Sequence, residues 1–254
     1  MIITLFIISL FGGFLSGFLG LGGAVVMIPL MLTIPPFFNV GTLTMKSVAG
    51  LSMIQVFFSS ISGIIIHKKN NFVHYQSLLF IGIPMGIFSL IGSYFSKCLN
   101  NEHILILFGF IILVAFFLLL IDTSKENTSE ISNISVNKQI SIIIGIIIGS
   151  ISGIVGAGGG FILIPLMIKI FKLPLKITIG TSLGIVFIGA LFGSLGKILS
   201  LQVNYLFLLP VIFGSLLSAQ LGARISKITS SKILKNILLF LIAISFIQVI
   251  IKIL

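Results

Sequence analysis

Residues 16–31 read SGFLGLGGAVVMIPLM, and residues 152–167 read SGIVGAGGGFILIPLM. The two stretches align without a gap, and nine of their sixteen positions are identical. After a shorter loop the match resumes at an offset of 130 over residues 46–97, where Lys46 pairs with Lys176. An apolar bias would align isoleucines and leucines by chance, but not the glycines, lysines and tyrosines that coincide here. The sequence therefore predicts an internal duplication.

Each quoted stretch lies within an apolar segment that is too long for one straight membrane span. The segments cover residues 2–34 and 139–168, whereas a straight helix crosses a bilayer in about 20 residues. In a helix interior a glycine costs about 1 kcal/mol relative to alanine, and a proline costs about 3 kcal/mol. The first segment contains Gly20, Gly22, Gly23 and Pro29, and the second contains Gly156, Gly158, Gly159, Gly160 and Pro165. We therefore expect the first helix of each repeat to be broken at its GxGG motif.

The remainder of the chain is also apolar. Only 7% of the 254 residues are charged and 57% are hydrophobic, whereas a soluble domain has about 25% charged residues. Charged side chains are absent from residues 1–45, 47–66, 75–96, 104–121, 139–168, 177–196, 198–223 and 236–251. These windows predict an all-α polytopic membrane protein with about eight transmembrane helices in two internal repeats.

The duplication and the charge pattern together predict the domain organisation. The first repeat covers residues 1–121, a polar linker covers 122–138, and the second repeat covers 139–254. With four spans in each half the repeats would be parallel, and an extra re-entrant leg in each half would make them inverted. Under the simple count of eight crossings, the lysine and arginine distribution favours both termini and the linker on the outer side.

A helix that restarts within the membrane exposes backbone N–H groups and the positive end of its dipole, which suits an anion. Broken helices at corresponding positions of two repeats also indicate the binding site of a transporter. The alternative is that the glycines only allow close helix packing. On the next segment of each repeat, hydroxyl and amide side chains add uncharged donors or helix-to-helix hydrogen bonds. The predicted solute-binding residues are Gly20, Gly22, Gly23, Ser52, Gln55, Gly156, Gly158, Gly159, Gly160, Thr181 and Ser182.

Two matched lysines, Lys46 and Lys176, stand where these second segments begin. We interpret them as residues that attract an anionic solute, with a purely topogenic role as the alternative. The net charge of +11 fits either reading, because short loops of membrane proteins need cations for topology and for contact with anionic headgroups.

Other classes of function are excluded by residues that the sequence lacks or places elsewhere. Cys98 is the only cysteine, and no aspartate or glutamate lies within a predicted span. His67, His74 and His103 fall at segment ends, without the spacing of a metal site. We therefore expect no catalytic residues, no metal, no cofactor and no nucleic-acid partner, and we predict that the protein is not an enzyme.

The duplicated motif, followed in the second half by KITIGTSL at residues 176–183, resembles the sulfite exporter TauE/SafE family, also known as the TSUP permeases or probable membrane transporter proteins. The resemblance covers nearly the whole chain, although the GTSL element becomes GLSM at residues 50–53. It implies a permease that moves sulfite or related organosulfur anions.

We therefore predict a secondary transporter of a small anion, most simply sulfite or an organosulfur anion, acting as an exporter. An anion channel and a membrane scaffold or assembly factor without flux are the alternatives. The expected partners are the anionic solute and membrane lipid, with a homo-oligomer left open. The expected location is the cell (inner) membrane, which the chain crosses several times.

Overall fold

The computed structural model describes residues 1–69, 72–120 and 136–253, and every regular element in these ranges is helical. The predicted linker, residues 122–138, lies outside the described residues except for its last three. Within the described residues, eight helices are long and apolar enough to cross a membrane. They are α1 (Ile2–Leu19), α3 (Met45–Lys69), α4 (Tyr75–Phe95), α5 (Asn101–Leu120), α6 (Lys138–Val155), α8 (Leu175–Leu199), α9 (Leu208–Ile228) and α10 (Ser231–Ile253). The predicted all-helical class is confirmed, and so are eight helices of membrane-spanning length.

Shorter helices lie between these spans. α2 (Ala24–Phe37) and α7 (Gly160–Ile170) follow the two GxGG motifs, and the 3-10 helices η1 (Ser96–Cys98) and η3 (Tyr205–Phe207) precede α5 and α9. Polar side chains start several of the elements at the molecular ends. The ring of His74 accepts a hydrogen bond from the backbone of α4, and the side chain of Asn204 does the same for η3. These caps satisfy N–H groups that have no partner within their own helix.

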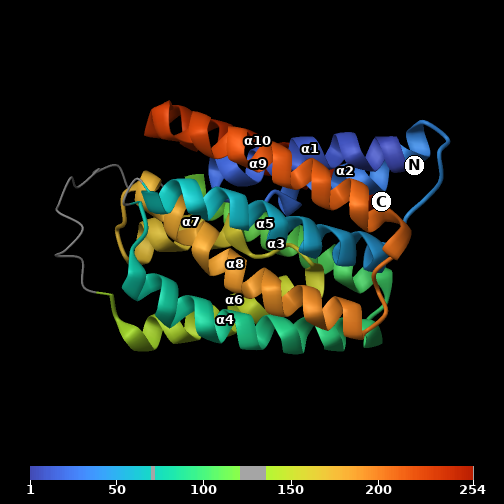
Figure 1. Ribbon diagram of the computed structural model, residues 1–254. Coiled ribbons are helices and arrows are strands. Elements are labelled where there is room, and N and C mark those ends of the chain that lie inside the picture. Colours follow the sequence, from blue (N-terminus) through green and yellow to red (C-terminus); the bar gives the residue numbers. More distant parts are fainter. Residues whose placement is uncertain (70–71, 121–135, 254) are drawn as a thin grey trace.

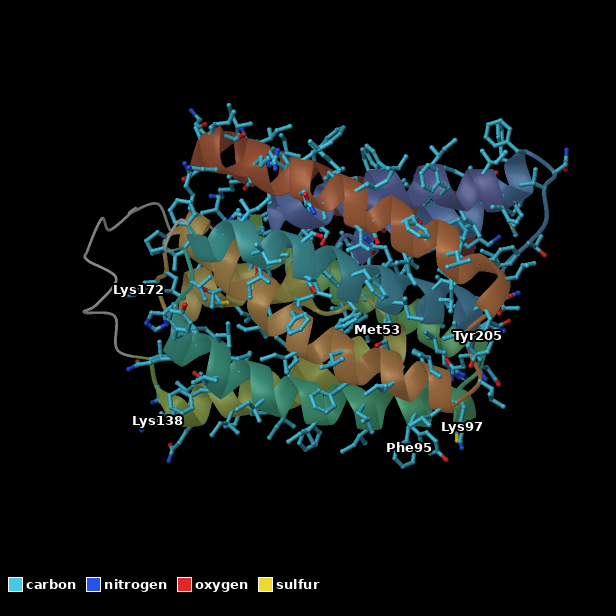
Figure 2. The ribbon with its side chains drawn as sticks, in the orientation of Figure 1. Met53, Phe95, Lys97, Lys138, Lys172 and Tyr205 are labelled. Atoms are coloured by element: carbon cyan, nitrogen blue, oxygen red, sulfur yellow. The ribbon has the colours of Figure 1, made fainter. Side chains whose placement is uncertain are left out.

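α2 does not continue the path of α1 but returns toward the start of the chain. Gly12, within α1, lies against the Met27 side chain of α2, and Gly41, beyond the end of α2, lies beside the side chain of Met1. In the other half, α7 also returns toward the end at which its preceding helix begins, because Figure 2 shows Lys172, just after α7, at the same end as Lys138, the first residue of α6. Each break is therefore the turn of a re-entrant hairpin.

The return helices place corresponding spans of the two halves in opposite directions. Figure 2 shows Lys97 and Tyr205 at one end of the molecule, and Lys138 and Lys172 at the other. α3 therefore starts at the end that carries Lys97, whose backbone it contacts through Lys46, while α8 starts just after Lys172 at the opposite end. The corresponding spans thus have the inverted arrangement, which the sequence had left open.

The re-entrant legs also correct the expected topology. Figure 1 marks both chain ends at the end of the molecule where α1 begins, whereas α6 begins at the far end. The expectation that the termini and the linker lie on one side is therefore wrong for the described end of the linker, residues 136–138, and the rest of the linker lies outside the described residues. Because α1 and α2 together make no net crossing, only α3, α4 and α5 carry the chain across before the second half begins.

The two halves are interleaved. α1 packs in parallel on α9, with Gly13 against Ser215, and α4 packs in parallel on α6, with Gly149 against Met85. Each half thus contributes its third span to a helix of the other. α3 and α8 pack against each other between these pairs, and they are the most buried of the spans. The duplication itself stays a prediction from the sequence.

Candidate functional site at the two helix breaks

The breaks are built from glycines with left-handed backbone conformations. α1 ends with a bond from the Gly20 N–H to the Ser16 carbonyl at 2.9 Å, and α6 ends with one from Gly156 to Ser152 at 2.8 Å. The φ angle lies between +65° and +80° at Gly20, Gly22, Gly23, Gly156, Gly158 and Gly159. A side chain in this region costs roughly 1–2 kcal/mol per residue. The chain can therefore turn back at these positions because they are glycines.

The two breaks meet in the middle of the protein. Gly160, the first residue of α7, packs on the backbone of the first break. Gly22 and Gly158 both contact the same two side chains, Val56 of α3 and Val186 of α8. All five residues are buried. The structure thus brings the two GxGG segments together between the central spans.

Serines from the central spans hold the breaks across the two halves. The Ser52 hydroxyl of α3 donates to the Gly156 carbonyl at 2.7 Å, and the Ser182 hydroxyl of α8 donates to the Gly20 carbonyl at 3.0 Å. These carbonyls end α6 and α1, so they have no partner within their own helices. Each serine has one proton to donate and has used it on the backbone. Both predicted serines therefore lie at the breaks, where their hydrogen bonds support the backbone.

The start of α2 carries free donors beside the meeting point. The Gly23 carbonyl accepts the first bonds of the helix, from the third and fourth residues of α2, and Gly159 does the same for α7. No acceptor in the described part of the chain bonds to the N–H groups of Ala24 or Val25, both fully buried. Their N–H groups and the helix dipole make this place favourable for negative charge.

Gln55 supplies a side-chain amide at the same place. It is fully buried on α3 beside Gly23, and neither its Nε2 nor its Oε1 has a hydrogen-bond partner among the described residues. The corresponding position of the second half, at the offset of 130, is the apolar Ile185. A buried unpartnered amide costs about 1–3 kcal/mol, so this one is a candidate contact for a bound solute.

Thr181 does not join this group. Its hydroxyl oxygen accepts a hydrogen bond of 2.9 Å from the backbone N–H of His74 at the start of α4. The side chain therefore fastens α4 to α8, one residue away from the serine that reaches the break.

Lys46 and Lys176 lie at opposite ends of the molecule. The Lys46 ammonium donates to the Lys97 carbonyl at 2.8 Å, and the Lys176 ammonium donates to the Lys227 carbonyl at 3.1 Å. Each is half-buried and ties the start of one central span to the end of the span that follows it in the same half. They lie at the two ends of the molecule and make no contact with the breaks.

The sequence analysis missed a buried cation. Lys197, near the end of α8, is fully buried, and its ammonium bonds to Ser96, Ile154 and Gln202. The sequence feature that could have indicated it is its position, because this one lysine separates two long uncharged windows, residues 177–196 and 198–223. A lysine at the end of a span usually reaches the interface, and only the tertiary structure shows that this one does not.

The family model described as sulfite exporter TauE/SafE matches residues 5–249. The chain is 29% identical over 248 residues to the probable membrane transporter protein YunE of Bacillus subtilis, covering 91% of this chain and 90% of the relative. It is 28% identical over 239 residues to the probable membrane transporter protein YdhB of the same organism, with 88% and 90% covered. A probable membrane transporter protein of Methanocaldococcus jannaschii is 26% identical over 241 residues, with 87% and 86% covered. No solved structure matches the chain.

Proposed function

Because the chain belongs to the sulfite exporter TauE/SafE family of multi-pass membrane transporters, we propose that it carries a small anion, sulfite or an organosulfonate, out of the cell. The solute-binding site is the meeting point of the two helix breaks. The groups that contact the solute are the Gln55 amide and the N–H groups that begin α2.

The observation that carries this proposal is the unpartnered amide of Gln55 beside the free N–H groups of Ala24 and Val25. Buried polar groups in proteins are almost always hydrogen-bonded, so three unpaired buried residues at one point indicate a ligand. N–H donors together with the positive end of a helix dipole select an anion over a cation. Among the described residues the one carboxylate side chain is Glu102, which lies exposed in the first turn of α5.

The fold supports a carrier over a channel, because the break residues are buried between the central spans. Two re-entrant hairpins of opposite direction give the site similar surroundings toward each membrane face, as alternating access requires. Export needs no coupling ion to be favourable, since one negative charge leaving a negative-inside cell gains about 2.3 kcal/mol per 100 mV.

The test is uptake of radiolabelled sulfite, and of a small organosulfonate, by proteoliposomes. Wild-type vesicles should take up the anion faster than empty vesicles, and an inside-positive potential should increase the rate. Uptake of cations or neutral solutes alone would contradict the anion site. Single-channel conductance in a planar bilayer would identify a channel, and the absence of any flux, together with a stoichiometric protein partner, would identify a scaffold.

A further inference from the structure

The most unusual charged group in the described chain is the ammonium of Lys197. It is fully buried, and it donates to Ser96 Oγ at 2.7 Å, to the Ile154 carbonyl at 2.9 Å and to Gln202 Oε1 at 2.9 Å. An ammonium has three N–H donors, so all three are used. Every acceptor is a neutral oxygen, which leaves the positive charge without a counter-charge.

No carboxylate in the described residues compensates this charge. Glu102, the one acidic side chain that the structure describes, is exposed and makes no ion pair with Lys197. Lys46, a charge of the same sign, lies at the same end of the molecule, where its ammonium bonds to the carbonyl of Lys97, the residue after Ser96. A buried charge is costly unless it is paired. The site therefore favours the arrival of an anion.

A pocket lies next to this network, at the end of the molecule that carries the chain termini. Its volume is about 550 Å³, and its lining includes Lys46, Ser47, Gln202 and Asn204. Gln202 belongs both to this lining and to the hydrogen-bond network of Lys197. The pocket opens beside Tyr205, which Figure 2 labels at this end. Lys197 itself does not line the pocket, so Gln202 is the residue that links the pocket to the network of the buried cation.

We propose that Lys197, Ser96 and Gln202 form a second anion-binding site beside this pocket, for a small oxyanion that enters past Gln202 and replaces Gln202 Oε1 as an acceptor of the Lys197 ammonium. The proposal rests on the anion transport proposed above, and it adds a site beside the pocket to the site at the breaks. Gln202 Nε2, which donates to Ser96 Oγ at 2.9 Å, would remain as a neutral donor beside the oxyanion, and Ser96 Oγ would remain as an acceptor of the Lys197 ammonium.

Lys197 also contacts the end of the helix that leads to the second break. Ile154 lies in the last turn of α6, two residues before the glycine that starts the break. Its carbonyl is one of the last four of the helix, which have no intrahelical partner, and Lys197 binds it at the negative end of the helix dipole. An anion that replaces Gln202 Oε1 would therefore bind to the same ammonium that holds the end of α6.

The opposite end of the molecule lacks this cation. At the offset of 130 the residue that corresponds to Lys197 is His67 (67 + 130 = 197), buried near the end of α3. Its Nε2 lies 3.4 Å from the Gly17 carbonyl, near the end of α1, and its Nδ1 has no partner in the described chain. The two ends of the molecule thus hold the broken helices with different groups, an ammonium at one and an imidazole at the other.

The experiment measures the heat stability of the detergent-purified full chain as sulfite is added at constant ionic strength, with gluconate as the balancing anion. Lys197→Met removes the cation, and Gln202→Glu supplies an internal carboxylate in the place of the external anion. Lys232→Gln removes an exposed lysine on α10 as the matched control. We expect wild type and Lys232→Gln to share one half-stabilising sulfite concentration, and both site variants to need at least about ten times more.

Gln202→Glu decides the result even if Lys197→Met fails to fold. Its carboxylate should make the protein more heat-stable without sulfite and less responsive to added sulfite than wild type, with only the site at the breaks still responding. An unchanged response to sulfite in Gln202→Glu would overturn the site beside the pocket and leave Lys197 as a cap for α6. If sulfite and organosulfonates stabilise neither wild type nor any variant, and wild type transports no anion, the proposed function fails instead.

Discussion

Replacing Gln55 by leucine should raise the stability of the protein and weaken its transport of sulfite. Leucine is close to glutamine in size and removes an amide whose two polar atoms have no partner in the described chain. Relief of one buried unsatisfied group is worth about 1–3 kcal/mol. For a protein of this size each kcal/mol shifts the melting temperature by about 2–4 °C, so Gln55→Leu should melt about 2–12 °C higher in the absence of solute. The same change removes a solute contact, and KM for sulfite should rise about tenfold, which corresponds to about 1.4 kcal/mol.

The assay pairs thermal unfolding in detergent with initial uptake rates in proteoliposomes, normalised to folded protein. Ser245→Ala is the matched control, because Ser245 also has a buried hydroxyl without a partner in the described chain but lies on α10, which supplies none of the atoms nearest to the break glycines. It should gain stability and keep the wild-type KM. A Gln55→Leu variant that melts lower than wild type would refute the reasoning, since the amide would then have a protein partner in the native state. A higher melting temperature with unchanged KM would show that the solute does not contact Gln55.

Four further substitutions test the breaks and the lysine at one end of the molecule. Gly158→Ala, at φ +65°, should lose transport per folded molecule. Gly145→Ala, whose added methyl meets α4, should lower stability but leave the transport rate per folded molecule unchanged. If both variants transport at the same rate per folded molecule, both glycines serve helix packing alone. Ser182→Ala leaves the Gly20 carbonyl without its cross-half donor and should lower the melting temperature by an amount corresponding to about 1–3 kcal/mol, and a change in KM with no change in stability would instead favour direct solute contact. Lys176→Gln should raise KM at low salt and much less at high salt, because exposed charges are screened over about 8 Å at physiological ionic strength. Uptake kinetics identical to wild type at both salt concentrations would show that Lys176 does not attract the solute.

Local sequence was sufficient for the helical class, the eight spans and the positions of the glycines at the turns, because apolar length and glycine cost act within one segment. The direction of α2 could not be predicted, since a broken helix can continue or turn back, and the choice depends on contacts such as Gly12 with Met27. The partner of Ser52 lies 104 residues away, so its role at the break is a tertiary property. Lys197 was missed for the same reason. The assignment of the remaining predicted residues to solute binding stays a prediction.

The exchange of spans between the halves has a consequence for biosynthesis. The packing partner of α1 is α9, which begins at Leu208, whereas α1 ends at Leu19 (208 − 19 = 189 residues). At a synthesis rate of roughly 5–20 residues per second, α1 waits about 10–40 s in the membrane before its partner is made. During that time the small-residue face around Gly13 and Gly17, which α9 later covers, is open to lipid or to other helices. The first half therefore cannot reach its final packing while it is being made, and the order of events at the ribosome must differ from the order of contacts in the finished protein.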